Sequence, residues 1–150
     1  VDLCGLLRRL FEGYRSVHPG RRIELRLPEG EQKLRCAPDL LAQALDKLVD
    51  NAVSLSGPED VVTLILKRRA GACELAVRNS GSRLPEALKE RLFDSLVSVR
   101  DKRGAGPHLG LGLYIVRLVA AAHGGKALAR NLPANQGVEF SIRLPAQPGA

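Results

Sequence analysis

The pattern of apolar and polar residues divides the chain into segments of helical and of extended periodicity. Apolar residues at helical spacing predict a first helix, which Asp2 caps and which ends near Val17. A broader apolar stripe predicts a second helix, which Asp39 caps and Gly57-Pro58 ends. A neighbouring stripe of this second helix is polar and carries Gln43, Lys47, Asn51 and Ser54.

Two further helices are expected in the second half of the chain. A short helix is predicted over residues 85–96, because a proline stands near its start. Residues 95–109 have no sustained periodicity and are rich in charge, so we expect a mobile loop there. The last helix follows from about residue 110 and is closed by Gly124. Its core face is predicted to consist of Leu111, Ile115, Leu118 and Ala122.

Segments with a period of two predict strands that pair mainly as hairpins. The element order is helix, two strands, helix, hairpin, helix, loop, helix, hairpin, which predicts an α+β fold. We expect a two-layer sandwich in which helices cover one face of a mostly antiparallel sheet. One hairpin is predicted to turn at Gly71-Ala72. The expected strands are 21–28, 33–38, 61–68, 73–79, 126–131 and 138–145.

Composition sets limits on the class of protein. A chain of 150 residues that is 45% apolar fits one domain with its own core. The net charge of +7 suits either a nucleic acid or a small anion such as a nucleotide. Scattered basic residues and 3% aromatics favour the small anion, so we expect no nucleic-acid partner. The three cysteines lie far apart, which predicts free thiols in a reducing cytoplasm. No apolar run is long enough to predict a membrane segment.

The first candidate site residue lies at the end of a predicted strand. Leu75, Val77 and Asn79 share a parity, so Asn79 is expected to point to the helix-covered side of the sheet. A buried amide needs hydrogen-bonding partners, and an adenine edge offers both a donor and an acceptor. Gly81 would let a ligand approach the backbone closely. The alternative is that Asn79-Ser80-Gly81 is only a turn.

Three more features suit a nucleotide, and each also has a structural explanation. Gly110-Leu111-Gly112-Leu113 lies where a loop is predicted to become a helix, and free N–H groups there suit a phosphate. Asn51 could offer an amide oxygen to Mg²⁺. Arg100, Lys102 and Arg103 could fold over the phosphates as a lid. The alternatives are helix-start packing, a solvated helix residue and a solvated loop.

The order of four motifs resembles the ATP-binding catalytic domain of sensor histidine kinases, in the superfamily shared with DNA gyrase, heat-shock chaperones and mismatch-repair ATPases. The motifs are "LVDNAV", "VRNSGSRLP", "RLFDSL" and "HLGLGLYIVRLVAAAHGG". The resemblance implies a Bergerat-type sandwich that binds ATP and Mg²⁺, with Asn79 on the adenine, Asn51 near the metal and the phosphates, and Gly110 and Gly112 at the phosphates. We expect Lys47 and Asn51 to be the catalytic residues, where Lys47 could pair with phosphate or occupy the place of the metal. Together with their neighbours in the motifs and in the basic loop, the residues expected to bind the cofactors are Asn51, Ser54, Asn79, Gly81, Arg83, Arg100, Lys102, Gly110, Leu111, Gly112 and Leu113.

The chain departs from the family pattern at several of these positions. Asn79 stands where the family has Asp, and Arg83 stands where it has a second Gly. Lys47 replaces a second Asn, one turn before Asn51. These departures motivate an alternative function, a degenerate domain with weak or no ATP binding that serves as a docking or regulatory module.

The resemblance also implies how the domain would act. We expect residues 1–150 to form one domain, a C-terminal part of a longer sensor kinase of the inner membrane, on its cytoplasmic side. The domain would present the γ-phosphate of ATP to a histidine on a separate His-bearing dimerisation domain of the same protein. A response regulator would act downstream. His18, His108 and His123 occupy turn, loop and helix-end positions, so none is expected to be the phosphoacceptor.

Overall fold

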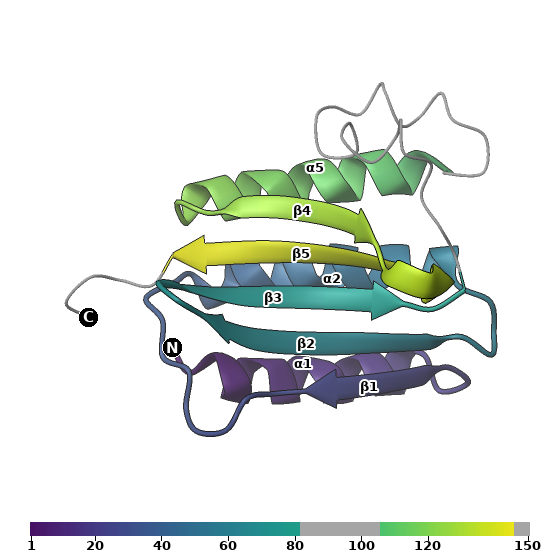
Figure 1. Ribbon diagram of the computed structural model, residues 1–150, viewed down its shortest axis with the longest axis horizontal. Coiled ribbons are helices and arrows are strands. Elements are labelled where there is room, and N and C mark those ends of the chain that lie inside the picture. Colours follow the sequence, from purple (N-terminus) through teal and green to yellow (C-terminus); the bar gives the residue numbers. More distant parts are fainter. Residues whose placement is uncertain (82–105, 146–150) are drawn as a thin grey trace.

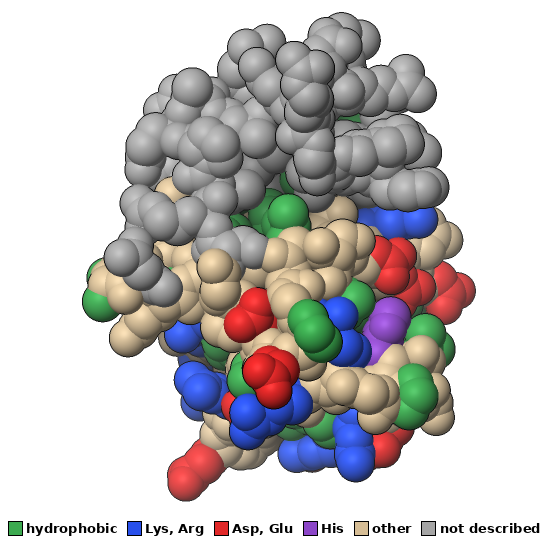
Figure 2. Space-filling model, turned by 90° about the vertical axis from the view of Figure 1, so that its right-hand side faces the viewer, with side chains coloured by type: hydrophobic (Ala, Val, Ile, Leu, Met, Phe, Trp, Pro, Cys, Tyr) green, Lys and Arg blue, Asp and Glu red, His purple; other side chains and the backbone are tan. Residues whose placement is uncertain are grey.

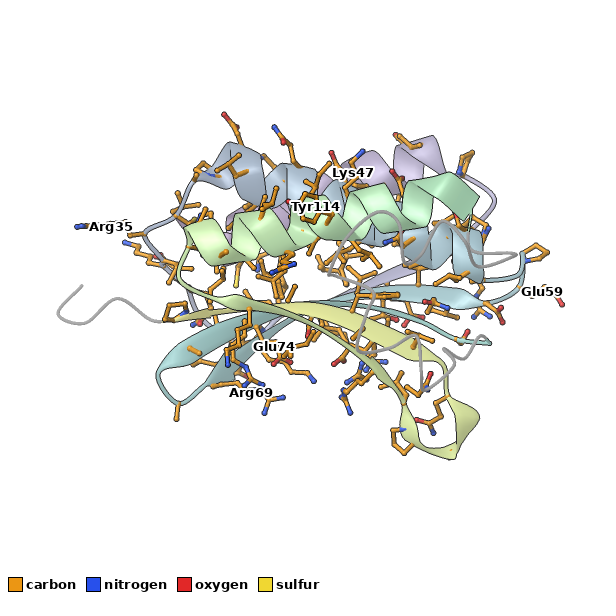
Figure 3. All side chains as sticks on the ribbon, turned by 90° about the horizontal axis from the view of Figure 1, so that it is seen from above. Arg35, Lys47, Glu59, Arg69, Glu74 and Tyr114 are labelled. Carbon is orange, nitrogen blue, oxygen red and sulfur yellow. The ribbon has the colours of Figure 1, made fainter. Side chains whose placement is uncertain are left out.

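The computed structural model describes residues 1–81 and 106–145, with the backbone alone for residues 106–112 and for Asn135. These residues form two layers, with helices on one face of a sheet (Figures 1 and 3). The helices are α1 (Leu3–Val17), α2 (Pro38–Leu55) and α5 (Gly106–Ala122). The predicted helix over residues 85–96, most of the predicted loop and the tail after Pro145 lie outside the described residues.

The sheet has the strand order β1-β2-β3-β5-β4. β1 pairs with β2 in parallel, and the other described pairs, β2 with β3, β3 with β5 and β4 with β5, are antiparallel. The predicted α+β sandwich with a mostly antiparallel sheet is therefore confirmed. The strands are β1 (Arg22–Arg26), β2 (Val61–Arg69), β3 (Ala72–Asn79), β4 (Lys126–Asn131) and β5 (Val138–Pro145), and a 3-10 turn (Pro133–Asn135) joins the last two in sequence.

The core lies between the sheet and the helices and is almost entirely aliphatic. Alternate residues of β3 and β5 point toward the helices and are fully buried, as the period of two predicts. The apolar stripe of α2 covers them, and α1 adds its own apolar face at the β1 side of the sheet. The fully buried residues of these two strands include Leu75, Val77, Val138, Phe140, Ile142 and Leu144.

Two predictions at the start of the second helix are wrong. Residues 33–38 do not form a strand, since Lys33 makes only an isolated bridge with Asp2. The reason is that this segment pairs with the start of the chain, where the N–H of Leu34 donates to the Val1 carbonyl at 2.9 Å. The N-cap of α2 is Ala37 rather than Asp39. Pro38 begins the helix, which leaves Asp39 in the first turn, where its negative charge suits the helix dipole.

The last helix differs from the prediction in its start and in its buried face. α5 begins at Gly106, so residues 106–109 are helical and not part of a loop. The buried face consists of Leu113, Val116, Val119 and Ala120, whereas Leu118 is 50% exposed. The sequence from Leu113 to Ala122 is apolar on almost every side, so packing on α2 decides which face is buried. The predicted end is confirmed, because Gly124 has φ +74° and the N–H of Gly125 donates to the Ala120 carbonyl at 2.8 Å.

The first hairpin turns one residue earlier than predicted. Arg69 pairs with Ala72, so the turn residues are Ala70 and Gly71 rather than Gly71 and Ala72. Gly71 has φ +71°, a conformation that glycine adopts without a steric penalty.

Candidate functional site

Asn79 is the last residue of β3, and its side chain points into the helix-covered layer. The side chain is 0% exposed, which confirms the predicted inward parity. Its strand neighbours in register are Val62 of β2 and Val138 of β5, both fully buried. Within the described residues, neither the amide nitrogen nor the amide oxygen of Asn79 has a hydrogen-bond partner. A buried amide with no partner is rare in a folded protein and calls for a ligand or another explanation.

Asn51 is a second buried amide, on α2, and its side chain is 4% exposed. Its amide nitrogen also lacks a partner within the part of the chain that the structure describes. α2 ends at Leu55, and the chain then enters β2, where Val62 pairs with Asn79. Asn51 and Asn79 therefore lie toward the same end of the sandwich, where β3 ends in Figure 1.

The N-terminal end of α5 lies at this same end of the fold. β4 follows α5 through the tight turn at Gly124 and runs back along the molecule, so that its last residue, Asn131, pairs with Val138. Gly110 and Gly112 are thereby brought toward Asn79, but they lie inside the helix and not at its start. The prediction that Gly110 and Gly112 lie at the start of a helix, where N–H groups are free, is therefore wrong. The helix begins earlier because Pro107 fits its first turn, where no N–H is needed.

The other predicted site residues are placed as follows. Lys47 lies on α2, one turn before Asn51, and is half-buried; Figure 3 shows it within the helical layer. Ser54 is exposed in the last turn of α2. Leu113 is fully buried in the core, and only the backbone is described for Leu111. Arg83, Arg100 and Lys102 lie outside the described residues.

The space beside Gly81 holds a side chain of the protein itself. A Cβ atom added to Gly81 would lie 2.3 Å from Oδ2 of Asp60, and the φ of Gly81 is +93°. The same carboxylate oxygen accepts a hydrogen bond from the Gly57 N–H at 2.7 Å. The position that a Cβ atom would take at Gly81 is therefore occupied by Asp60, which leaves no space for a larger residue there. The sequence did not reveal this contact, because it joins two turns that are 20 residues apart.

Gly137 is a positioning residue that the sequence interpretation missed. Its φ is +117°, and a Cβ atom added to it would lie 1.9 Å from the carbonyl oxygen of Asn79. The start of β5 thus packs directly on the backbone of Asn79 and Ser80. Beyond this contact, the Val61 N–H donates to Oγ of Ser80 at 2.9 Å, which extends the pairing of β2 and β3 past Asn79. The end of β3 is held from both sides.

The opposite face of the sheet carries buried carboxylates paired with arginines. Nε of Arg78 donates to Oε2 of Glu139 at 2.6 Å, and Nε of Arg130 donates to Oε1 at 3.0 Å. Burial alone would raise the pKa of Glu139, but these hydrogen bonds outweigh it and the pKa lies below its ordinary value. Glu74 is likewise buried and pairs with Arg69 and Arg143 (Figure 3 labels Arg69 and Glu74).

A cavity of about 240 Å³ opens where β1, β2 and β3 meet, on the sheet face opposite the described helices, so the Asn79 side chain points away from it. It is lined by Glu24, Arg26, Val61, Thr63, Arg78, Asn79, Ser80, Leu132 and Gln136. Figure 2, which views the molecule from the end at which β3 finishes, shows acidic and basic side chains interspersed on the described surface. The described surface at this end thus carries charges of both signs.

His123 has a structural role. Its Nε2 accepts a hydrogen bond from the Ala37 N–H at 3.0 Å, and its Nδ1 lies 2.8 Å from the Val119 carbonyl, to which it donates in the tautomer that fits both contacts. The ring therefore joins the end of α5 to the N-cap of α2. Among the described residues, no group of three or more His, Cys, Asp or Glu side chains could hold a metal ion. No helix in the described part of the chain is long and apolar enough to cross a membrane.

Fold and site together define a known class of domain. Residues 36–148 match the family model of the histidine kinase-, DNA gyrase B- and HSP90-like ATPases. The chain belongs to this family. Its relatives are sensor histidine kinases, and its structural neighbours are their catalytic domains.

One relative of the chain is a sensor protein. It is 30% identical over 146 residues to the alginate biosynthesis sensor protein KinB of Pseudomonas aeruginosa, which covers 96% of this chain and 24% of KinB. The chain therefore spans about a quarter of the length of that relative.

Solved structures have the same fold. The catalytic domain of histidine kinase ThkA superposes with a TM-score of 0.82 at 23% identity, over 97% of this chain and 94% of that one. The ATP binding domain of PrrB from Mycobacterium tuberculosis gives a TM-score of 0.78 at 27% identity, over 98% and 96% of the two chains. ThkA has also been solved in complex with the response regulator protein TrrA, at a TM-score of 0.78 and 24% identity, over 99% of this chain and 41% of ThkA.

Proposed function

We propose that this chain binds ATP with Mg²⁺ and presents the γ-phosphate to a histidine on a separate His-bearing dimerisation domain of the same full-length protein. The observation that carries the proposal is the pair of buried amides, Asn51 and Asn79, at one end of a sandwich of this ATPase family. In this proposal residues 1–150 are one domain, the catalytic ATP-binding part of a protein-histidine kinase. It works in two-component signal transduction, on the cytoplasmic side of an inner-membrane sensor kinase.

Each residue has a defined task in this proposal. Asn79 pairs with the adenine edge through the amide that has no described partner. Asn51 would hold Mg²⁺ through its amide oxygen, a donor type that this cation accepts, while water and phosphate oxygens complete the shell. Lys47, one helical turn earlier, would face the phosphates and stabilise charge during transfer. Bound Mg²⁺ would neutralise phosphate charge.

The remaining predicted cofactor contacts stay part of the proposal. They involve Ser54, Gly81, Arg83, Arg100, Lys102, Gly110, Leu111, Gly112 and Leu113. The partners are likewise inferred: ThkA was solved with a response regulator protein, which supports such a partner for this chain too. In this proposal the phosphoacceptor belongs elsewhere in the full-length protein, and both ring nitrogens of His123 are engaged within the fold, so this side chain is not free to accept a phosphoryl group.

Calorimetry with a non-hydrolysable ATP analogue, with and without Mg²⁺, tests the proposal. We expect binding that Mg²⁺ strengthens and that Asn51→Ala weakens by about tenfold or more. Gln43→Ala is the matched control, because Gln43 lies exposed on the same stripe of α2, two turns earlier, and its loss should leave binding unchanged. No heat of binding at millimolar analogue would rule the proposal out.

One observation favours a second function, a degenerate domain that docks or regulates without using ATP. Gly110 and Gly112 lie inside α5, and Lys47 stands one turn before Asn51 where a second amide is usual in the family. If this function holds, the double change Asn51→Ala and Asn79→Ala leaves phosphorylation of the partner histidine unchanged in the full-length protein. A loss of that phosphorylation would favour the ATP-binding function.

A further inference from the structure

The side-chain amide of Asn79 is buried with no described group to fix its orientation. Its nitrogen and its oxygen both lack partners within the described residues, and its side chain is fully buried. The side chains beside it in register, Val62 and Val138, are apolar and cannot hydrogen bond to it. Rotation by 180° about the last side-chain bond, which exchanges nitrogen and oxygen, therefore breaks no described hydrogen bond.

This freedom matters because purine bases differ in the polarity of the edge that they present. A 6-aminopurine such as adenine offers a donor at N6 and an acceptor at N1. A 6-oxopurine such as hypoxanthine offers the reverse, an acceptor at O6 and a donor at N1. A carboxamide carries one acceptor and one donor side by side, so it can pair with either edge, one in each orientation. An ionised carboxylate only accepts and would place negative charge against O6.

We infer that the base subsite at Asn79 accepts 6-oxopurine nucleotides as well as adenine nucleotides, and that the amide of Asn79 is what permits both. The inference rests on the proposed function, since it assigns the base specificity of the same site. The start of β5 packs closely on the backbone of Asn79, so we expect rotation of the side chain, rather than movement of the strand end, to adapt the site to each base.

The test compares nucleotides on the unmodified 150-residue chain by calorimetry in the presence of Mg²⁺. The ligands are ATP, inosine triphosphate and inorganic tripolyphosphate, the last of which reports binding through phosphate alone. We expect inosine triphosphate to bind within about tenfold of ATP, and both to bind at least about tenfold more tightly than tripolyphosphate. If ATP binds more tightly than tripolyphosphate but inosine triphosphate does not, the inference is overturned and the proposed function stands. If neither nucleotide binds more tightly than tripolyphosphate, the inference and the proposed function are both overturned.

A pair of variants assigns the effect to the side chain of Asn79. Asn79→Asp should keep the affinity for ATP within about tenfold of that of the unmodified chain. It should lower the affinity for inosine triphosphate by about tenfold more than it lowers the affinity for ATP. Gln43→Glu introduces the same charge on the exposed surface of α2 and should leave the ratio of the two affinities unchanged. Circular dichroism checks that each variant is folded. If Asn79→Asp is folded and its ratio of affinities for ATP and inosine triphosphate is unchanged, the role of the amide is overturned. If this variant does not fold, the ligand series on the unmodified chain still decides which bases the site accepts.

Discussion

At the scale of single residues, Glu139 shows how a carboxylate is kept inside a sheet face that none of the described helices covers. Its side chain is only 3% exposed, yet two arginines donate to its two oxygens. Arg78, one of the two, directly precedes Asn79 in β3. A buried, hydrogen-bonded carboxylate of this kind stabilises the fold only while it is ionised, so its contribution depends on pH.

We predict that Glu139→Gln destabilises the domain at pH 7 by about 1.5–3 kcal/mol, the usual range for hydrogen bonds to a charged group. The folded pKa of Glu139 lies below its ordinary value of 4.5, so its contribution is complete above that value and is lost as the pH falls through the folded pKa. Urea denaturation at pH 7 and near pH 3 measures the difference between the two proteins, which should shrink at the lower pH.

The matched control for this prediction is Glu24→Gln, on the exposed part of β1. It should change stability by no more than about 0.5 kcal/mol at either pH, because an exposed carboxylate has little to lose. A difference for Glu139→Gln that stays constant with pH would contradict the account of the ion pairs.

At the scale of elements, Gly137 determines how closely the start of β5 can approach the end of β3. Gly137→Ala should destabilise the domain by more than about 2 kcal/mol, because a Cβ atom 1.9 Å from the Asn79 oxygen forces the strands apart at a strained φ. Thermal denaturation measures the loss. If Gly137→Ala is as stable as the unmodified protein, the two strand ends do not pack as closely as described.

Gly13→Ala serves as the control for this prediction, because nothing lies within 4 Å of the added atom in the middle of α1. This second substitution should instead stabilise the domain by about 0.5–1 kcal/mol, since alanine favours a helix more than glycine.

The elements also show which parts of the fold the sequence determines locally. The strands of both hairpins could be predicted, because a period of two together with turn residues is a local signal. The start and the buried face of α5 could not, because that helix is apolar on nearly all sides and its packing on α2 decides them. The strand predicted over residues 33–38 is wrong for a similar reason, since this segment pairs with Val1 and Asp2, more than 30 positions away in sequence.

At the scale of the whole molecule, the fold brings Asn51 and Asn79 to one end of the sandwich from two elements that do not follow each other in sequence. The inward direction of Asn79 followed from its parity in the strand. Three other features could not be predicted, because each depends on a segment distant in sequence. They are the missing hydrogen-bond partner of Asn79, the carboxylate of Asp60 beside Gly81 and the contact of Gly137 with Asn79. The nucleotide roles assigned to these residues rest on the resemblance and stay predictions.

The central claim is that the buried amide of Asn79 meets the base of a bound nucleotide. The most direct measurement follows the side-chain NH₂ resonances of Asn79, Asn51 and Gln43 by NMR during titration with Mg²⁺ and ATP, and separately with tripolyphosphate. The account predicts that ATP shifts the Asn79 signals while tripolyphosphate leaves them in place, that both ligands shift Asn51, and that exposed Gln43 responds to neither. Asn79 signals that stay unchanged at saturating ATP would contradict the account.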